Sequence, residues 1–341
     1  MSAIAFFYPD GHEAHFESGH PERPQRLEAI RSAFQNQEWW EDAAHLQAMP
    51  VPQDVLRAVH SPDYLEVLQA ASRQGRHLDA DTYTTPASWD LALQAAGGAI
   101  AIARSVWLGE NRSGFALTRP PGHHATRNRG MGFCLLNNIA IATEDLLQRG
   151  EARKLAIVDL DLHHGNGTQD IFYQRGEVLY ISTHQSPLYP GTGFLTETGA
   201  ADGQGANANF PLPPYTGNRG FKVVMQDFIL PLLDRFSPEM LLVSVGFDPH
   251  WRDPLGMLML SAKAYGDLVS DLASWANEHA EGKIALFLEG GYDLEAGAAC
   301  ALASVSALLQ LPFDDPLGPS PYEESDAWRR TIEKAQALWN V

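Results

Sequence analysis

The stretch Leu-Ala-Ile-Val-Asp-Leu-Asp-Leu-His-His-Gly-Asn-Gly, residues 155–167, decides the fold class and the chemistry of this chain. Its first part, residues 155–158, is apolar and partly β-branched, which is typical of a strand buried on both faces. Asp159, Asp161 and His163 then alternate with leucines, and side chains two residues apart in an extended backbone point to the same side. A solvated acidic turn would explain this pattern, but a divalent metal ion would also offset the cost of burying two carboxylates and an imidazole.

Similar apolar runs predict the remaining strands, and amphipathic periods predict helices between them. Strands are expected at residues 3–8, 115–118, 178–183, 241–245 and 284–288. Helices are expected at 25–34, twice within 50–72, at 88–108 with Ser88 as the cap, and at 135–148, 221–235, 262–280, 294–310 and 323–339. This alternation predicts an α/β fold with a mostly parallel sheet of about eight strands and helices on both faces. We expect a single domain over residues 1–341, in which about 312–341 form a C-terminal wrap and helix.

Composition excludes several classes of function. The chain of 341 residues carries 24 Lys and Arg against 42 Asp and Glu, a formal charge of −18. This balance argues against direct nucleic-acid binding and is compatible with a cationic substrate, a high-salt habitat or simple solubility. No signal peptide or run of about 18 apolar residues is evident, so no membrane span is expected. Cys134 and Cys300 lie in apolar surroundings, which favours a reduced, cytoplasmic protein without disulfides.

Chemically active side chains directly follow four of the predicted strands. They are the pair His123 and His124, the pair Asp161 and His163, Asp248, and Tyr292. Ligands bind outside the carboxyl ends of strands in open parallel sheets, so we expect these side chains to share one crevice. Asp161, Asp248 and a neutral His163 would balance an ion of charge +2 and leave one coordination position open, as in catalytic zinc sites. Such an ion brings the pKa of water from about 15.7 to about 7.

The tandem histidines suit proton transfer, because Asp159 and Asn166 from the central stretch could orient them. Pairing with a carboxylate would make one histidine more basic than the other, as an acid and a base require. Tyr292 could donate a hydrogen bond to a developing oxyanion. The alternatives are two surface histidines in a proline-rich loop and a core tyrosine whose hydroxyl is satisfied.

Together these strings resemble the zinc-dependent histone deacetylase family, which includes bacterial deacetylase-like amidohydrolases and acetylpolyamine amidohydrolases. The resemblance covers nearly the whole chain and implies the arginase/deacetylase-like fold. It is carried by His-Pro-Glu-Arg-Pro (20–24), Arg-Pro-Pro-Gly-His-His-Ala (119–125), Gly-Phe-Cys (132–134), Asp-Leu-Asp-Leu-His-His-Gly-Asn-Gly-Thr-Gln (159–169), Pro-Gly-Thr-Gly (190–193), Gly-Phe-Asp (246–248) and Leu-Glu-Gly-Gly-Tyr-Asp-Leu (288–294).

The resemblance implies a role for each site residue. It makes Asp161, His163 and Asp248 ligands of one zinc ion, and Tyr292 the polariser of the substrate carbonyl. It makes His123 and His124 the acid/base pair, oriented by Asp159 and Asn166 respectively. It implies a narrow substrate channel walled by Phe133 and Tyr189 and lined further by Gly132, Leu255 and the rim residue His20. It also implies a structural potassium ion near Asp159, Asp161, His163, Ser182 and Thr183.

Two positions bear on the substrate. Leu255 stands where polyamine-selective relatives carry a glutamate, which weakens the case for a polyamine substrate. Tyr292 is present where one low-activity subgroup has histidine, so catalytic competence is expected. We expect a zinc-dependent amidohydrolase that removes acetyl or a similar short acyl group from an acyl-lysine or a small acylated amine. The alternatives are an acetylpolyamine-specific amidohydrolase, a binuclear manganese hydrolase of the arginase type, and a catalytically weak acyl-lysine binding protein. The sequence is compatible with a homo-oligomer.

Overall fold

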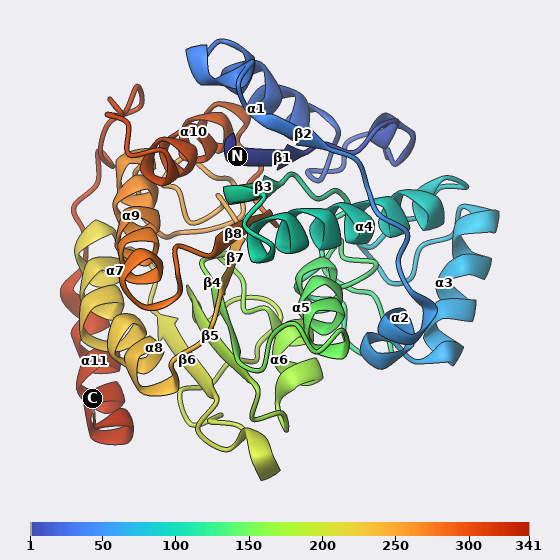
Figure 1. Ribbon diagram of the computed structural model, residues 1–341. Coiled ribbons are helices and arrows are strands. Elements are labelled where there is room, and N and C mark those ends of the chain that lie inside the picture. The colour runs from blue at the N-terminus through green and yellow to red at the C-terminus, as the bar shows by residue number, and fades with distance from the viewer. Residues whose placement is uncertain (1, 341) are drawn as a thin grey trace.

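The computed structural model describes residues 2–340, which build one sheet of eight strands paired in parallel in the order β2-β1-β3-β8-β7-β4-β5-β6 (Figure 1). The strands are β1 (Ser2–Phe7), β2 (Ala44–Leu46), β3 (Asn111–Ala116), β4 (Leu155–Asp159), β5 (Val178–Gln185), β6 (Asn207–Leu212), β7 (Leu241–Val245) and β8 (Ile284–Leu288). The expected α/β class and parallel sheet are confirmed.

Helices cover both faces of this sheet, with α4 and α5 on one side and α9 and α10 on the other (Figure 1). The first layer holds α2 (Gln53–Val59), α3 (Pro62–Gln74), α4 (Ser88–Trp107), α5 (Asn138–Gln148) and α6 (Asn166–Phe172). The second holds α1 (Gln25–Gln35), α7 (Asn218–Val224), α8 (Leu230–Phe236), α9 (Ala262–His279), α10 (Leu294–Leu308) and α11 (Arg329–Trp339). Short 3-10 helices lie at His12–Ala14, Glu38–Trp40, Ala201–Gly203 and Asp326–Trp328.

The central strand β4 shows why the sheet is covered on both sides. Ala156 and Val158 pack into the core beneath α9, whereas Leu155 and Ile157 pack into the core beneath α4 and α5. Both sets are fully buried, so an uninterrupted apolar run suits this strand better than an alternating one. Burial of apolar surface on two faces supplies most of the stabilisation of such a sheet.

Two edge strands were not expected from the sequence. β2 has only three residues, and β6 carries Asn207, Asn209 and Pro211 among its apolar residues. Short or polar strands fit the edges of a sheet, because one side of their backbone needs no partner strand. Their sequence patterns are therefore weak.

Three predicted helix details are wrong. The helix expected from residue 135 begins at Asn138, because the Asn137 side chain caps it by accepting the Ala140 N–H at 3.1 Å. A π-helical turn at Met225–Ile229 interrupts the helix expected at 221–235. Ser88 does not cap α4.

The side chain of Ser88 is turned inward instead. Its hydroxyl lies 2.6 Å from His15 Nδ1 and accepts the Thr85 N–H at 2.7 Å, while Ala87 occupies the cap position without a side-chain bond. A buried histidine thus competes successfully for the hydroxyl that would otherwise satisfy the start of the helix.

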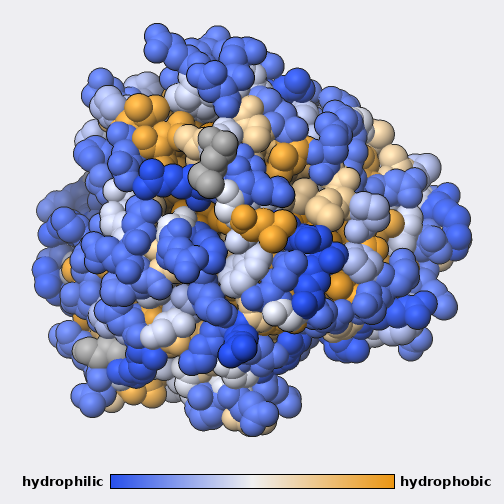
Figure 2. All heavy atoms as spheres, viewed as in Figure 1, coloured by the Kyte–Doolittle hydropathy of each residue, from blue (hydrophilic) through white to orange (hydrophobic). Residues whose placement is uncertain are grey.

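The strands end at one level, which assembles the site. Asp159 at the end of β4 is paired in register with Ser182 on β5 and Ser244 on β7. The loops after β3, β4, β7 and β8 therefore open at the same edge of the sheet. Hydrophilic side chains cover most of the face seen in Figure 2. Among the described residues, no helix is long and apolar enough to cross a membrane.

Candidate active site

Asp161, His163 and Asp248 converge at this edge of the sheet. Their ligating atoms lie within 4.8 Å of one another. His163 Nδ1 is 3.2 Å from Asp161 Oδ1 and 3.1 Å from Asp248 Oδ2. Both carboxylates are fully buried, so the three side chains form a compact set of two oxygen ligands and one nitrogen ligand, which suits zinc.

Backbone donors hold the two carboxylates in place. The N–H groups of His163 and Gly290 donate to Asp161 at 2.8 and 2.9 Å, and the Leu162 N–H donates to Asp248 Oδ1 at 3.1 Å. A Cβ atom at Gly290 would collide with the Asp248 carboxylate, so glycine is required there.

One buried carboxylate oxygen indicates that a cation binds here. Asp248 Oδ2 is buried and accepts no well-oriented hydrogen bond, although His163 Nδ1 is close to it. Burial and the neighbouring Asp161 charge raise the pKa of Asp248. An ion of charge +2 would satisfy this oxygen and offset the repulsion between two buried carboxylates. The residues therefore fit a divalent metal.

The two histidines lie beside this cluster with different partners. His123 Nδ1 is 3.1 Å from Asp159 Oδ2, and His124 Nδ1 is 2.8 Å from Asn166 Oδ1. The ring centroids are 4.1 Å apart. Because an amide oxygen only accepts, His124 carries its proton on Nδ1 and presents Nε2 as a base.

These partners separate the proton affinities of the two rings. Burial opposes the charge of His123, but Asp161 and Asp159 outweigh it and raise its pKa to about 10. Burial and the charges of His123 and His163 lower the pKa of His124 well below its ordinary value. The two partners therefore make His123 the more basic ring and His124 the less basic one, as an acid and a base require.

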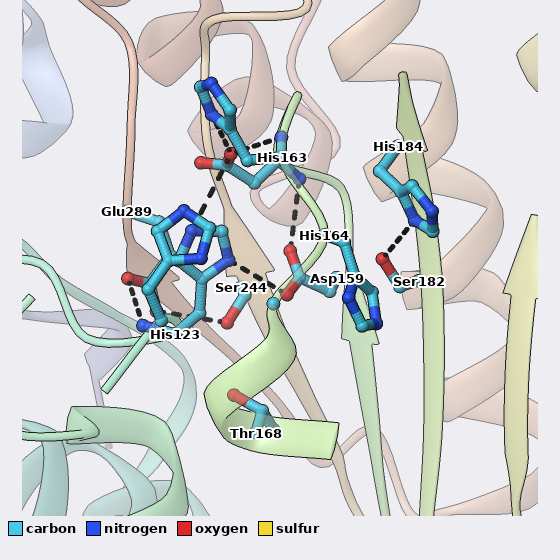
Figure 3. A network of polar contacts seen from close by, with 12 residues as sticks. His123, Asp159, His163, His164, Thr168, Ser182, His184, Ser244 and Glu289 are labelled. Atoms are coloured by element: carbon cyan, nitrogen blue, oxygen red, sulfur yellow. Dashed lines mark hydrogen bonds and ion pairs between the residues drawn. The ribbon is translucent and has the colours of Figure 1, made fainter. Parts of the chain in front are cut away.

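Glu289 supports the histidine pair and was not found from the sequence. Its carboxylate accepts the N–H groups of Gly122 at 2.6 Å and His123 at 3.0 Å, and the Ser244 hydroxyl at 3.2 Å. Figure 3 shows His123 bonded to Asp159 through its ring and to Glu289 through its backbone. Burial raises the pKa of Glu289 to about 7. The signal in the sequence that could have identified Glu289 is its position directly after the apolar strand 284–288.

Tyr292 has one aromatic neighbour, Phe133, and one cationic neighbour, Arg26. Its ring meets Phe133 edge to face with centroids 5.8 Å apart, and the Arg26 guanidinium lies 4.8 Å from its centroid. Burial raises the pKa of Tyr292 well above its ordinary value, so the hydroxyl stays protonated. A neutral phenol can donate a hydrogen bond.

A buried cluster of ion pairs contacts the backbone directly before Tyr292. Glu22 Oε1 is 2.7 Å from Arg119 Nε and 3.1 Å from Arg26 Nη1. Arg26 also donates from Nε to the Gly291 carbonyl at 2.6 Å. The sequence pointed to the His-Pro-Glu-Arg-Pro string but not to these roles, because its partners are distant in the chain.

Of the expected channel residues, Gly132 and Tyr189 lie beside His124, and Phe133 contacts both His20 and Tyr292. No such contact is found for Leu255 among the described residues. The Tyr189 ring is 5.3 Å from that of His124, and Phe133 is 4.6 Å from His20. Gly132 has φ +55, and a Cβ there would collide with the His124 ring. Leu255 is half-buried; its neighbour Pro254 lines a hollow of about 430 Å³ together with His20 and Tyr292.

The residues expected around potassium are close together, but their hydroxyls have partners within the protein. Ser182 Oγ lies 2.9 Å from His184 Nδ1 (Figure 3), and the Thr183 hydroxyl donates to the Asp159 carbonyl at 3.3 Å. The side chains of Asp161 and His163 belong to the metal cluster. The potassium site stays a prediction.

Comparisons with known proteins agree on one family. The histone deacetylase domain model matches residues 20–308. A probable deacetylase of Archaeoglobus fulgidus is 39% identical over 91% of this chain and 87% of its own length. A histone deacetylase-like amidohydrolase of Pseudomonas aeruginosa is 36% identical over 88% of this chain and 80% of its own length. The crystal structure of the HDA15 HD domain superposes with a TM-score of 0.90 at 34% identity, covering 99% of this chain and 94% of that one.

Proposed function

Because the chain belongs to the histone deacetylase family and is a hydrolytic deacetylase, we propose that it removes an acetyl or similar short acyl group from an acylated primary amine. The substrate is an acyl-lysine side chain or a small acylated amine. The convergence of Asp161, His163 and Asp248 beside His123, His124 and Tyr292 carries this proposal.

Each residue has a defined task. Asp161, His163 and Asp248 would hold one zinc ion, which when bound polarises the amide carbonyl and makes water more acidic. His124 is neutral, and its Nε2 accepts the proton of the attacking water.

His123 and Tyr292 stabilise the leaving amine and the oxyanion that form after the water attacks. His123, made the more basic ring by Asp159, would carry the proton that the leaving amine takes up. The protonated hydroxyl of Tyr292 donates a hydrogen bond to the oxyanion. Hydrolysis then yields a carboxylate and a free amine.

Leu255 and the apolar rings of the channel support a neutral acyl-lysine over a polyamine. Phe133 and Tyr189 offer apolar walls to the methylene arm of a substrate, and no carboxylate stands at position 255 to bind a second ammonium group. An acetylpolyamine preference is the second candidate, which the net charge of −18 favours. The proposal also includes one structural potassium ion and a single catalytic domain. It further includes a cytoplasmic location, which the two free, buried cysteines support.

A substrate panel tests the proposal. The zinc-loaded protein is assayed with acetyllysine peptides, acetylputrescine, acetylspermidine and longer acyl amides, and kcat/KM is compared across the panel. We expect the acetyllysine peptides to be hydrolysed best. A preference for acetylspermidine would favour the second candidate, and binding without hydrolysis of any amide would indicate an acyl-lysine binding protein. Elemental analysis showing two metals per chain would favour the arginase-type alternative.

A further inference from the structure

Asp253 joins the two loops that end at the active site. Its carboxylate is nearly buried, with 6% of the residue exposed, and accepts three backbone N–H groups. Oδ2 accepts those of Tyr292 at 2.6 Å and Asp293 at 3.1 Å, and Oδ1 accepts that of Leu255 at 3.0 Å. One side chain on the loop after β7 therefore holds the backbone of the loop after β8.

The loop after β8 needs such a restraint. Gly290 and Gly291 precede Tyr292, and Gly291 has φ +110, a conformation that L side chains rarely adopt. Glycines leave the backbone free to take several conformations. The position of the Tyr292 ring would therefore vary unless the backbone at residue 292 were fixed.

Burying the Asp253 carboxylate costs stability. Within residues 2–340 no arginine or lysine pairs with Asp253, and the neighbouring Arg252 pairs instead with Asp293 at 3.4 Å and Glu295 at 2.8 Å. Burial and the charge of Asp248 raise the pKa of Asp253 to about 7. Hydrogen bonds offset only part of the cost of burying a carboxylate without a cationic partner, and groups perturbed in this way are concentrated at functional sites.

We propose that Asp253 is a positioning residue for Tyr292: by binding the N–H groups of Tyr292 and Leu255 with its two oxygens, it sets the phenol hydroxyl where the oxyanion forms. This inference rests on the proposed function of Tyr292 as an oxyanion donor. Donors of this kind act only within hydrogen-bond distance of the developing charge, so a small displacement is costly.

A double-mutant cycle tests it. In Asp253→Ala both acceptor oxygens are removed, so the N–H groups of Tyr292, Asp293 and Leu255 all lose this acceptor. We expect kcat to fall by about 10- to 100-fold, with KM and bound zinc little changed. In a Tyr292→Phe background the same substitution should change kcat by less than about twofold, because the group it positions is already absent.

Two further variants complete the design. Arg252→Ala removes the ion pair between the same two loops without touching the Tyr292 N–H, and should keep the wild-type kcat. If Asp253→Ala does not fold, Asp253→Glu, whose longer side chain displaces both acceptor oxygens, enters the same cycle. Equal losses of kcat in both backgrounds, or none in the wild type, would overturn the inference.

A readout that needs no turnover separates this inference from the proposed function. The Tyr292 amide should exchange slowly with deuterium in the wild type and faster in Asp253→Ala. Unchanged protection of that amide would overturn the positioning role even in an active enzyme. A wild type that protects the amide but hydrolyses no acylated amine would instead count against the proposed function.

Discussion

At the scale of single residues, His123 and His124 are neighbours in the chain but have opposite proton affinities. Asp159 faces one ring and Asn166 faces the other, and this difference between a carboxylate and an amide separates their pKa values. A side chain's partner, rather than its type, therefore determines its role in proton transfer.

Replacing His124 by alanine should remove the neutral base. We expect kcat on an acetyllysine peptide to fall by about 10²- to 10⁴-fold, with zinc content unchanged because His124 is not in the metal cluster. Steady-state kinetics and elemental analysis measure the two effects. Retained activity would overturn the acid/base assignment.

Tyr292→Phe removes one hydroxyl while keeping the ring that packs on Phe133. We expect kcat to fall by about 10²- to 10³-fold with full metal content. Tyr322→Phe is the matched control, because that tyrosine is 66% exposed. Near-normal turnover of Tyr292→Phe would exclude the tyrosine from the reaction.

At the scale of elements, a buried ion cluster connects the start of α1 to the loops after β3 and β8. Glu22 pairs with Arg119 and Arg26, and Arg119 also donates to the His12 carbonyl at 2.6 Å. Removing Glu22 would leave two arginines buried without their carboxylate, which is strongly destabilising.

The cluster predicts how stability depends on pH. Burial opposes the charge of Glu22, but Arg119 and Arg26 outweigh it and lower its pKa from 4.5 to about 2. A lowered carboxylate pKa contributes stability that is present above pH 4.5 and is lost as the pH falls towards 2. The shift corresponds to roughly 3 kcal/mol.

Urea unfolding of the wild type and Glu22→Gln between pH 7 and pH 3 checks this. The variant should be less stable at pH 7, and the difference between the two proteins should shrink as the pH falls below 4.5. A difference that is independent of pH would show that Glu22 contributes through packing rather than charge.

At the scale of the whole molecule, the sheet concentrates negative charge at one edge. Asp159, Asp161, Asp248 and Glu289 are all buried there, because the neighbouring strands β8, β7 and β4 end at the same level. Repulsion between these carboxylates lowers the stability of the metal-free protein, so a bound cation should stabilise the fold as well as the reaction.

Zinc should therefore raise the melting temperature of chelator-treated protein by several degrees, since a ligand at 100 times its Kd contributes about 2.7 kcal/mol. Differential scanning calorimetry with and without zinc measures the shift. Asp248→Asn is the control: it removes one ligand charge, so it should lose the zinc-dependent shift without lowering the stability of the metal-free protein. An equal zinc shift in both proteins would place the ion elsewhere.

Much of this arrangement could be predicted from the chain alone. The apolar run at 155–158, the alternation of Asp159, Asp161 and His163, and the positions of reactive residues after strands are local patterns. They determine the α/β class and indicate which side chains meet at the carboxyl edge, because strand period and parallel pairing leave few other arrangements.

Only the tertiary structure decided how these side chains are supported. Arg26 binds the Gly291 carbonyl across 265 positions, and Asp253 reaches Tyr292 from the neighbouring loop. The edge strand β6 and the inward-turned Ser88 likewise depend on distant partners. A local pattern carries no information on which remote donor meets which acceptor, because packing of the whole chain must first bring the two within hydrogen-bond distance.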